Sequence, residues 1–391
     1  MAERRSKSNK KFMVLSALCI FMVVDHHTFT AFNLFGDFIP YNSFFMPLFV
    51  FISGYFNKVD SDTKLLPYIL KKVKTLIIPY AGLSLLIFAI KLLLDWFKLG
   101  LVPEVPSWYF PYALERVFTI GSFEAMATPM WFVLPLFLAL ILYSILKKLL
   151  AKIWNSYVML AFFCAMHLIV VYLARTINPE ELAFVLIPLK AMFFMPFLEM
   201  GIIYRDHLES KHTGLPAGGK IVLLFILLGL NTIRMMYLPN AYDVAFDSLD
   251  DLSGFTSPFI VTPLLSSVIG MLFWLTIVDL IGKSLYESRF VNYMSCNTFW
   301  IMGLHVMFFN ILNCILMAIS EHLINLPYFD TEYFRETEWY FWDCYPNFRM
   351  VYVVIGILGP LGMKWLWDKI ILKVAGANDA ESIPGWPPVL K

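Results

Sequence analysis

The chain has 391 residues, of which 59% are hydrophobic and 15% are charged, and its net charge at pH 7 is +1. Soluble chains carry about 25% charged residues, so this composition excludes a soluble domain. The near-zero net charge, without a long basic block, gives no indication of nucleic-acid binding. The five cysteines show no CxxC or Cys/His spacing, so neither a disulfide framework nor a metal site is predicted.

Apolar runs of membrane-spanning length recur along the whole chain, since a bilayer core needs about 20 apolar residues per helix. The basic start leads into a long apolar run with no small-residue cleavage site, which indicates a retained first span. We therefore predict an all-α integral membrane protein, a bundle of about ten transmembrane helices. The predicted spans are residues 12–34, 41–57, 75–97, 130–146, 154–174, 185–204, 220–238, 258–282, 294–319 and 348–372.

Lysine and arginine gather in alternate connecting segments, as they do on the cytoplasmic side of membrane proteins. The N-terminal segment is basic, whereas the loops around 243–251 and 332–343 are acidic. This alternation predicts that both termini are cytoplasmic. The predicted organisation is a basic N-terminus (1–11), a transmembrane domain (12–373) and a C-terminal tail (374–391).

The first span contains three consecutive polar residues, Asp25, His26 and His27. Ionisable groups inside a membrane segment indicate a functional site by default. At 1.5 Å per residue they lie about 20 Å from the inner surface. An imidazole there is suited to act as a base, with a neighbouring carboxylate fixing its tautomer. The alternative is that the span is short and the triplet lies among the outer headgroups.

Two later features each have a structural and a functional interpretation. Ser53 and Gly54 either allow close helix packing, which spacing alone favours, or leave room and a hydroxyl beside the histidines. The basic run Lys71-Lys72-Val73-Lys74 either anchors the next span on the cytoplasmic side or binds the phosphates of a cytosolic cofactor.

In the ninth span, Asn297 and His305 share a helix face. A lone buried histidine is more often a hydrogen-bonded core residue than a catalyst. Other polar residues in spans are, taken singly, more consistent with structural roles: Asp279, Glu199, Lys190 and His167. The outer loop 328–348 is rich in aromatic residues, which indicates either an interfacial belt or a sugar-binding cleft.

Four segments in this order resemble the acyltransferase family 3 integral-membrane proteins. They are Val23-Val24-Asp25-His26-His27-Thr28, the Phe-rich run from Phe45 to Ser53-Gly54-Tyr55-Phe56, Lys71-x-x-Lys74 before Pro79-Tyr80, and Asn297-Thr298 followed by His305. Pro129-Met130-Trp131-Phe132-Val133-Leu134 and Phe197-Leu198-Glu199-Met200-Gly201 add weaker agreement. The resemblance covers roughly residues 10 to 373.

The resemblance implies transfer of an acyl group, with acetyl the first expectation, from cytosolic acyl-CoA to a hydroxyl of a cell-surface glycan or glycolipid. It implies a multi-pass protein of a bacterial plasma membrane, with acetyl-CoA as donor substrate and no tightly bound cofactor. It also implies a site. The candidate catalytic residues are His27, His26, Asp25 and His305. The candidate donor-binding residues are Lys71, Lys74, Ser53, Gly54 and Asn297. The candidate acceptor-binding residues are Trp131, Trp339 and Trp342.

The chain departs from the family pattern at two places. Ser16 stands where the family commonly has arginine or lysine, and the nearest lysine is Lys11. Lys71 and Lys74 stand where arginine is usual, which removes bidentate phosphate contacts. Two rival functions remain open: a transporter or flippase for a lipid-linked glycan, and a membrane anchor without chemistry. The absence of a recognisable internal repeat disfavours a transporter.

Overall fold

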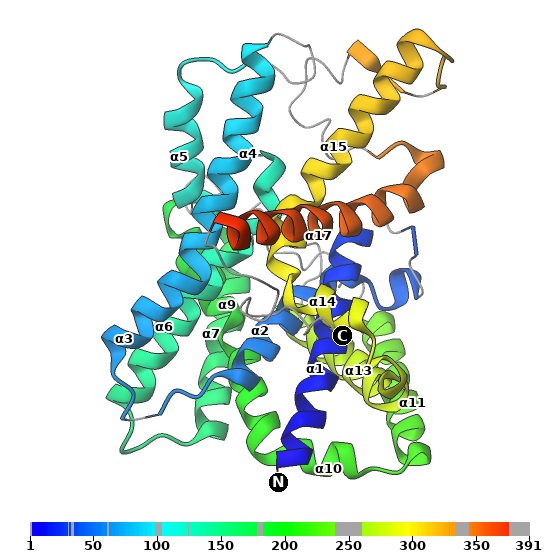
Figure 1. Ribbon diagram of the computed structural model, residues 1–391. Coiled ribbons are helices and arrows are strands. Elements are labelled where there is room, and N and C mark those ends of the chain that lie inside the picture. The colour runs from blue at the N-terminus through cyan, green and yellow to red at the C-terminus, as the bar shows by residue number, and fades with distance from the viewer. Residues whose placement is uncertain are drawn as a thin grey trace.

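The computed structural model (Figure 1) describes residues 2–29, 31–32, 35–60, 62–97, 104–123, 125–177, 183–238, 260–327, 329–332 and 344–374. Every regular element in these ranges is helical, which confirms the predicted all-α class. Within them, eight helical segments are long and apolar enough to cross a membrane. They are Leu65–Trp96, Met126–Leu149, Ser156–Ala174, Leu186–Gly214, Ala217–Tyr237, Thr262–Leu285, Thr298–His322 and Pro346–Ile371.

The first two predicted spans correspond to α1 (Ala2–His26) and α2 (Phe45–Phe56). α2 has 12 residues. At 1.5 Å per residue it is about 18 Å long, against a hydrocarbon core of about 30 Å. A helix of that length does not cross a bilayer alone, so α2 falls short of the full span predicted for residues 41–57.

α1 ends where the candidate histidines begin. The last turn closes with hydrogen bonds from Thr28 N–H to Asp25 O at 3.0 Å and from Phe29 N–H to His26 O at 3.1 Å. Phe29 has φ 58°, the left-handed conformation that commonly terminates helices, here on a residue other than glycine. His27 therefore leaves the helix axis at a tight turn.

The third predicted span is longer than expected. α3 (Leu65–Lys72), a π-helical segment η3 (Val73–Ile77) and α4 (Ile78–Trp96) form one continuous run. Lys71 and Lys74 thus lie within this run instead of in a loop before it. The segment after α4, predicted as a loop, contains α5 (Tyr109–Thr119), whose Tyr109 ring stacks on Phe88 of α4 at 6.1 Å.

The remaining helices complete the bundle in Figure 1. They are η4 (Ala125–Phe132), α6 (Val133–Leu149), α7 (Ser156–Thr176), α9 (Leu186–Ile203), η6 (Tyr204–Leu208), α10 (Glu209–Gly214), α11 (Ala217–Tyr237), α13 (Thr262–Ile281), α14 (Arg289–Cys296), α15 (Thr298–His322) and α17 (Arg349–Val374). Short 3-10 turns lie at Gly36–Phe38, Tyr41–Ser43, Ala183–Val185, Gly282–Leu285 and Pro346–Phe348. Of the long apolar segments, the one containing α9 is the most enclosed, with 78% of its apolar window buried.

Two glycines hold α2 directly against α9. A Cβ on Gly54 would lie 2.1 Å from the backbone oxygen of Leu198, and one on Gly201 would lie 2.1 Å from that of Phe51. No side chain fits at either position, so the two backbones touch, as small residues permit in membrane helices. This contact fixes α2, whose first turn faces the candidate histidines.

A buried polar cluster joins the other ends of the helices, near the N-terminus in Figure 1. The Lys11 Nζ donates to Tyr204 Oη at 3.0 Å and lies 3.6 Å from Glu209. Lys220 pairs with Asp279 at 2.6 Å, and Lys11 lies 3.9 Å from the same carboxylate. These contacts connect α1, α10, α11 and α13 at one end of the bundle.

Candidate functional site

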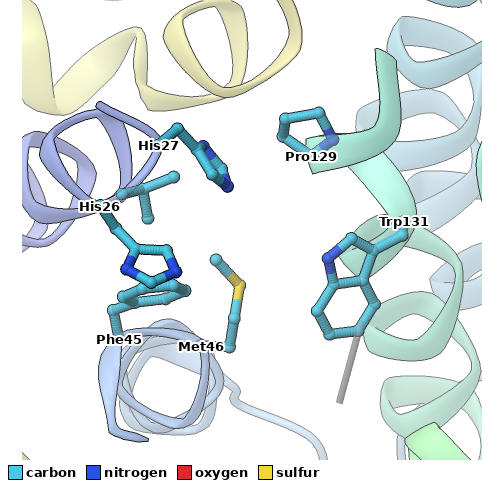
Figure 2. Close-up of a pocket in the computed structure, with 7 residues that line it drawn as sticks. His26, His27, Phe45, Met46, Pro129 and Trp131 are labelled. Atoms are coloured by element: carbon cyan, nitrogen blue, oxygen red, sulfur yellow. The ribbon is translucent and has the colours of Figure 1, made fainter. Parts of the chain in front are cut away.

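The turn after α1 places two histidines at a small pocket between three elements (Figure 2). Val23, His26 and His27 come from α1 and its turn, Phe45 and Met46 from the start of α2, and Pro129 and Trp131 from η4. A water-sized group can be centred in about 20 Å³ of the space between them, and the whole gap, open solvent at its mouth included, is about 310 Å³. Four of the seven lining side chains are apolar, and the polar groups among the side chains are the two imidazoles and the indole N–H.

His27 is paired with His305 of α15, although the two residues are 278 positions apart in the chain. The Nδ1 of His27 lies 2.7 Å from the Nε2 of His305, and the two rings are nearly parallel. His305 itself is completely buried. The structure thus brings together two of the four candidate catalytic residues from opposite ends of the sequence.

The hydrogen bonds assign the tautomers of the pair. The Nδ1 of His305 lies 2.9 Å from the backbone oxygen of Ile301, which only accepts, so this Nδ1 carries the proton. In the neutral ring the Nε2 of His305 is then an acceptor, and the Nδ1 of His27 donates to it. The proton-accepting nitrogen of neutral His27 is therefore Nε2. A base whose tautomer is fixed by a second residue is a common catalytic arrangement.

Gly303 allows η4 to approach His305. A Cβ on Gly303 would lie 2.8 Å from Leu83 Cδ1 and 2.9 Å from Met130 Sδ. Met130 stands between Pro129 and Trp131, so this close packing of η4 on α15 sets the wall that faces His27.

Trp131 forms the side of the pocket opposite the histidines, with its indole nitrogen on the pocket side of the ring (Figure 2). Its ring stacks on Phe194 of α9 at 6.2 Å, and the Nζ of Lys190 lies 4.3 Å from the ring centroid. Lys190 is completely buried. The indole is thus held from behind by two residues one helical turn apart on α9.

His26 and Asp25 take different positions from His27, because successive helical residues point about 100° apart. His26 lines the pocket, with its ring 5.6 Å from that of Phe45. The Asp25 carboxylate accepts the backbone N–H of Phe32 at 3.0 and 3.2 Å and is fully buried. Asp25 therefore stabilises the turn after α1, and the hydrogen-bond partner of His27 Nδ1 is His305 instead.

The chain after α15 returns to cover this turn. The Cys344 thiol lies 3.7 Å from the backbone oxygen of His27, and the Arg349 guanidinium lies 5.4 Å from the Phe29 ring. Trp339 and Trp342, two of the predicted acceptor-binding residues, fall outside the described residues.

The predicted donor-binding residues do not line the pocket. Ser53 and Gly54 lie roughly two turns along α2 from Met46, about 10 Å away along the helix. Asn297 precedes α15 and donates from its amide to the Tyr293 oxygen at 2.8 Å, about 12 Å along the helix from His305. Lys71 in α3 and Lys74 in η3 are exposed on the surface of the bundle, so a ligand in solution is able to reach them.

Lys11 does not stand in for the cation missing at Ser16, because its ammonium is held by Tyr204 and the carboxylate of Glu209. The sequence motifs do not predict that Lys190 contacts the Trp131 ring on the face away from the pocket. The one usable signal was the spacing of Lys190 and Phe194, which places both on one face of a helix.

Among the residues that the structure describes, no group of three or more His, Cys, Asp or Glu side chains is placed to hold a metal ion. The long apolar helices and the enclosed histidine pair define a multi-pass membrane protein with a buried polar site. Residues 12–359 match the family model of an acyltransferase domain, that of acyltransferase family 3. Since the match covers most of the chain, the protein belongs to this family and is a membrane-embedded acyltransferase. No curated protein and no solved structure matches the chain significantly.

Proposed function

We propose that the protein transfers an acyl group, acetyl in the first instance, from acyl-CoA to a hydroxyl of a cell-surface glycan or glycolipid. The observation that carries this proposal is the His27–His305 pair beside a pocket in an acyltransferase of this family. A base with a fixed tautomer, lining a small pocket between α1, α2 and η4, suits proton transfer from a hydroxyl.

In the proposed reaction, the Nε2 of His27 removes the proton from the acceptor hydroxyl as its oxygen attacks the thioester carbonyl carbon. The C=O electron pair moves onto the oxygen and forms a tetrahedral oxyanion. When this pair re-forms the carbonyl, the C–S bond breaks and the sulfur takes the proton from His27. The products are an ester and free coenzyme A, and His27 returns to its neutral state.

The same nitrogen also allows a two-step route. Nε2 would then attack the thioester carbonyl, the C–S bond would break, and coenzyme A would leave as the thiolate. The hydroxyl would next take the acyl group from the imidazole, and its proton would pass to the coenzyme A sulfur. The two routes differ in whether the acyl group is ever attached to protein, which a labelled donor detects.

The donor enters, in this proposal, from the end of the bundle where α1 begins and α3 lies (Figure 1). The exposed ammonium groups of Lys71 and Lys74 bind its phosphates there as point charges. The charge alternation of the connecting segments supports a cytoplasmic location for this end and for both termini. The acceptor reaches the histidines from the opposite, outer side of a bacterial plasma membrane.

The test uses purified protein or membranes incubated with acetyl-CoA that is radiolabelled in the acetyl group, with and without crude surface polysaccharide. We expect wild type to release coenzyme A and to move label to glycan or protein. His27→Ala should reduce transfer by at least about 10²-fold, the usual contribution of a general base. His322→Ala is the matched control, because it removes an exposed histidine from the far end of α15.

Full activity of His27→Ala would overturn the assignment of His27. Absence of thioester cleavage by wild type, with every acceptor preparation, would favour a different donor or transport of a lipid-linked glycan.

A further inference from the structure

The pocket contains one hydrogen-bond donor that the reaction above leaves unused. The side chain of Trp131 is 5% exposed, and its indole N–H has no acceptor among the described residues. Figure 2 shows this nitrogen on the pocket side of the ring, facing His27 across the empty space. The N–H borders the open pocket, so it remains available to donate to a ligand oxygen there.

The lining side chains other than the histidines narrow the ligand group that Trp131 is able to bind to an acceptor oxygen. Phe45, Met46, Val23 and Pro129 offer no donor, so Trp131 is the only one of the described lining residues opposite the histidines that is able to bind an oxygen. His27 then activates the nucleophile that attacks the carbonyl carbon, and Trp131 binds the oxygen of the same carbonyl. A carbonyl under attack requires a donor at the place that its oxyanion takes.

Lys190 adds to the polarity of this donor. Its Nζ lies 4.3 Å from the ring centroid of Trp131, inside the range of a cation–π contact, and its side chain is fully buried. An ammonium over the ring face draws electron density from the indole, which makes its N–H a stronger donor. Phe194 holds the ring from the same helix and fixes the direction of the N–H.

We propose that the indole N–H of Trp131 binds the carbonyl oxygen of the acyl thioester and stabilises the oxyanion that forms on it, with Lys190 as a positioning residue. The inference rests on the proposed acyl transfer and deepens it. As the hydroxyl oxygen bonds to the carbonyl carbon, the C=O pair becomes an alkoxide lone pair that accepts from Trp131. When the C–S bond breaks, the carbonyl re-forms and the sulfur takes the proton from His27.

The experiment removes the N–H and leaves the ring. Trp131 is replaced by benzothienylalanine, introduced by nonsense suppression, in which sulfur stands in place of the indole N–H. Coenzyme A release from acetyl-CoA is then measured as kcat and KM. We expect kcat to fall by about 10²–10³-fold, as on removal of one oxyanion donor, with KM little changed. Trp131→Phe should likewise lower kcat and leave KM little changed.

The matched control is the same replacement at Trp154, whose indole nitrogen is buried without an acceptor among the described residues. Its loss should leave kcat unchanged. Lys190→Met should lower kcat by about tenfold, the size of a desolvated cation–π contact, and Lys190→Arg should restore most of it.

Wild-type kcat in the benzothienylalanine variant would overturn the inference. A raised KM at unchanged kcat would also overturn it, since Trp131 would then only bind substrate. Wild-type protein that cleaves no thioester would instead reject the proposed function, and the inference with it. The thermal unfolding temperatures of all variants identify any loss that comes from misfolding.

Discussion

At the residue scale, His305 determines which nitrogen of His27 is basic. The chain of hydrogen bonds from His27 through His305 to the Ile301 oxygen leaves only one neutral arrangement of protons. Without an acceptor at His27 Nδ1, the imidazole is free to exchange tautomers and to rotate. His305 is therefore a positioning residue for His27 in the proposed reaction.

We expect His305→Ala to lower kcat by about 10²-fold or more, because His27 then loses the residue that fixes both its tautomer and its ring orientation, and with them its general-base contribution. His305→Gln should recover part of this loss, since the side-chain oxygen of glutamine also accepts from His27 Nδ1. Steady-state rates of coenzyme A release at several pH values measure both. A Gln variant no better than Ala, or an Ala variant as active as wild type, would contradict this role.

The sequence predicts which residues are candidates for the site, but it does not predict which of them are in contact when they lie far apart in the chain. His27 and His305 are each recognisable from the sequence as polar residues in apolar spans. Their contact, however, joins helices at opposite ends of the chain, and no local sequence pattern predicts such a contact. Asp25 illustrates the opposite case, a residue that is close in sequence but does not contact His27 Nδ1. It adjoins the histidines in sequence, yet the helical twist turns its carboxylate toward Phe32 N–H. Neighbours in sequence are poor guides to neighbours in a site.

At the element scale, close backbone contact between α2 and α9 sets the position of the pocket floor. Phe45 and Met46, at the start of α2, line the pocket, and Gly54 holds the other end of the same short helix against Leu198. The sequence interpretation of Gly54 as a packing residue fits this geometry.

Gly54→Ala should destabilise the protein by at least about 1–3 kcal/mol, because its methyl group would overlap the Leu198 oxygen at 2.1 Å. Gly82→Ala is the control: no other group lies within 4 Å of the place its methyl carbon would take, so it should have no effect or stabilise α4 slightly. Thermal unfolding in detergent compares them. Equal unfolding temperatures for the two variants would refute the close contact.

The sequence predicts elements well where they are long. Hydropathy locates the eight long apolar segments, since each must be apolar throughout its length. It does not locate α5, the limits of α2 or the π-helical segment η3, because these depend on packing against other helices. Apolar runs of 12 residues have no unique interpretation from composition alone.

At the scale of the whole molecule, the polar cluster of Lys11, Glu209, Lys220 and Asp279 ties the first helix to later ones. Asp279 is 2% exposed and contacts both lysines. Because the cluster is buried, the stability of the protein is sensitive to the loss of any one of its charges, which leaves the opposite charge unpaired.

Asp279→Asn should lower stability by about 3–5 kcal/mol, the usual cost of breaking a buried ion pair. The control is Glu287→Gln, which breaks the exposed pair with Lys10 and should change the unfolding temperature very little. Thermal unfolding of the two variants in the same detergent measures both changes in stability. A similar small shift in both would mean that the cluster is solvated.

The short α2 has a consequence for how far each substrate has to travel. The helix is about 18 Å long, and its first turn borders the histidine pocket while its last turn leads toward α3 and its lysines. In the proposed arrangement, with the donor entering near α3, the pocket borders the end of α2 that is farther from the donor entrance. The proposed donor, acyl-CoA, has a long flexible arm that suits a route along α2, and the proposed polymer acceptor then needs to present only one hydroxyl at the pocket. The proposed function thus predicts selection of the acceptor by reach, with little demand on the rest of the polymer.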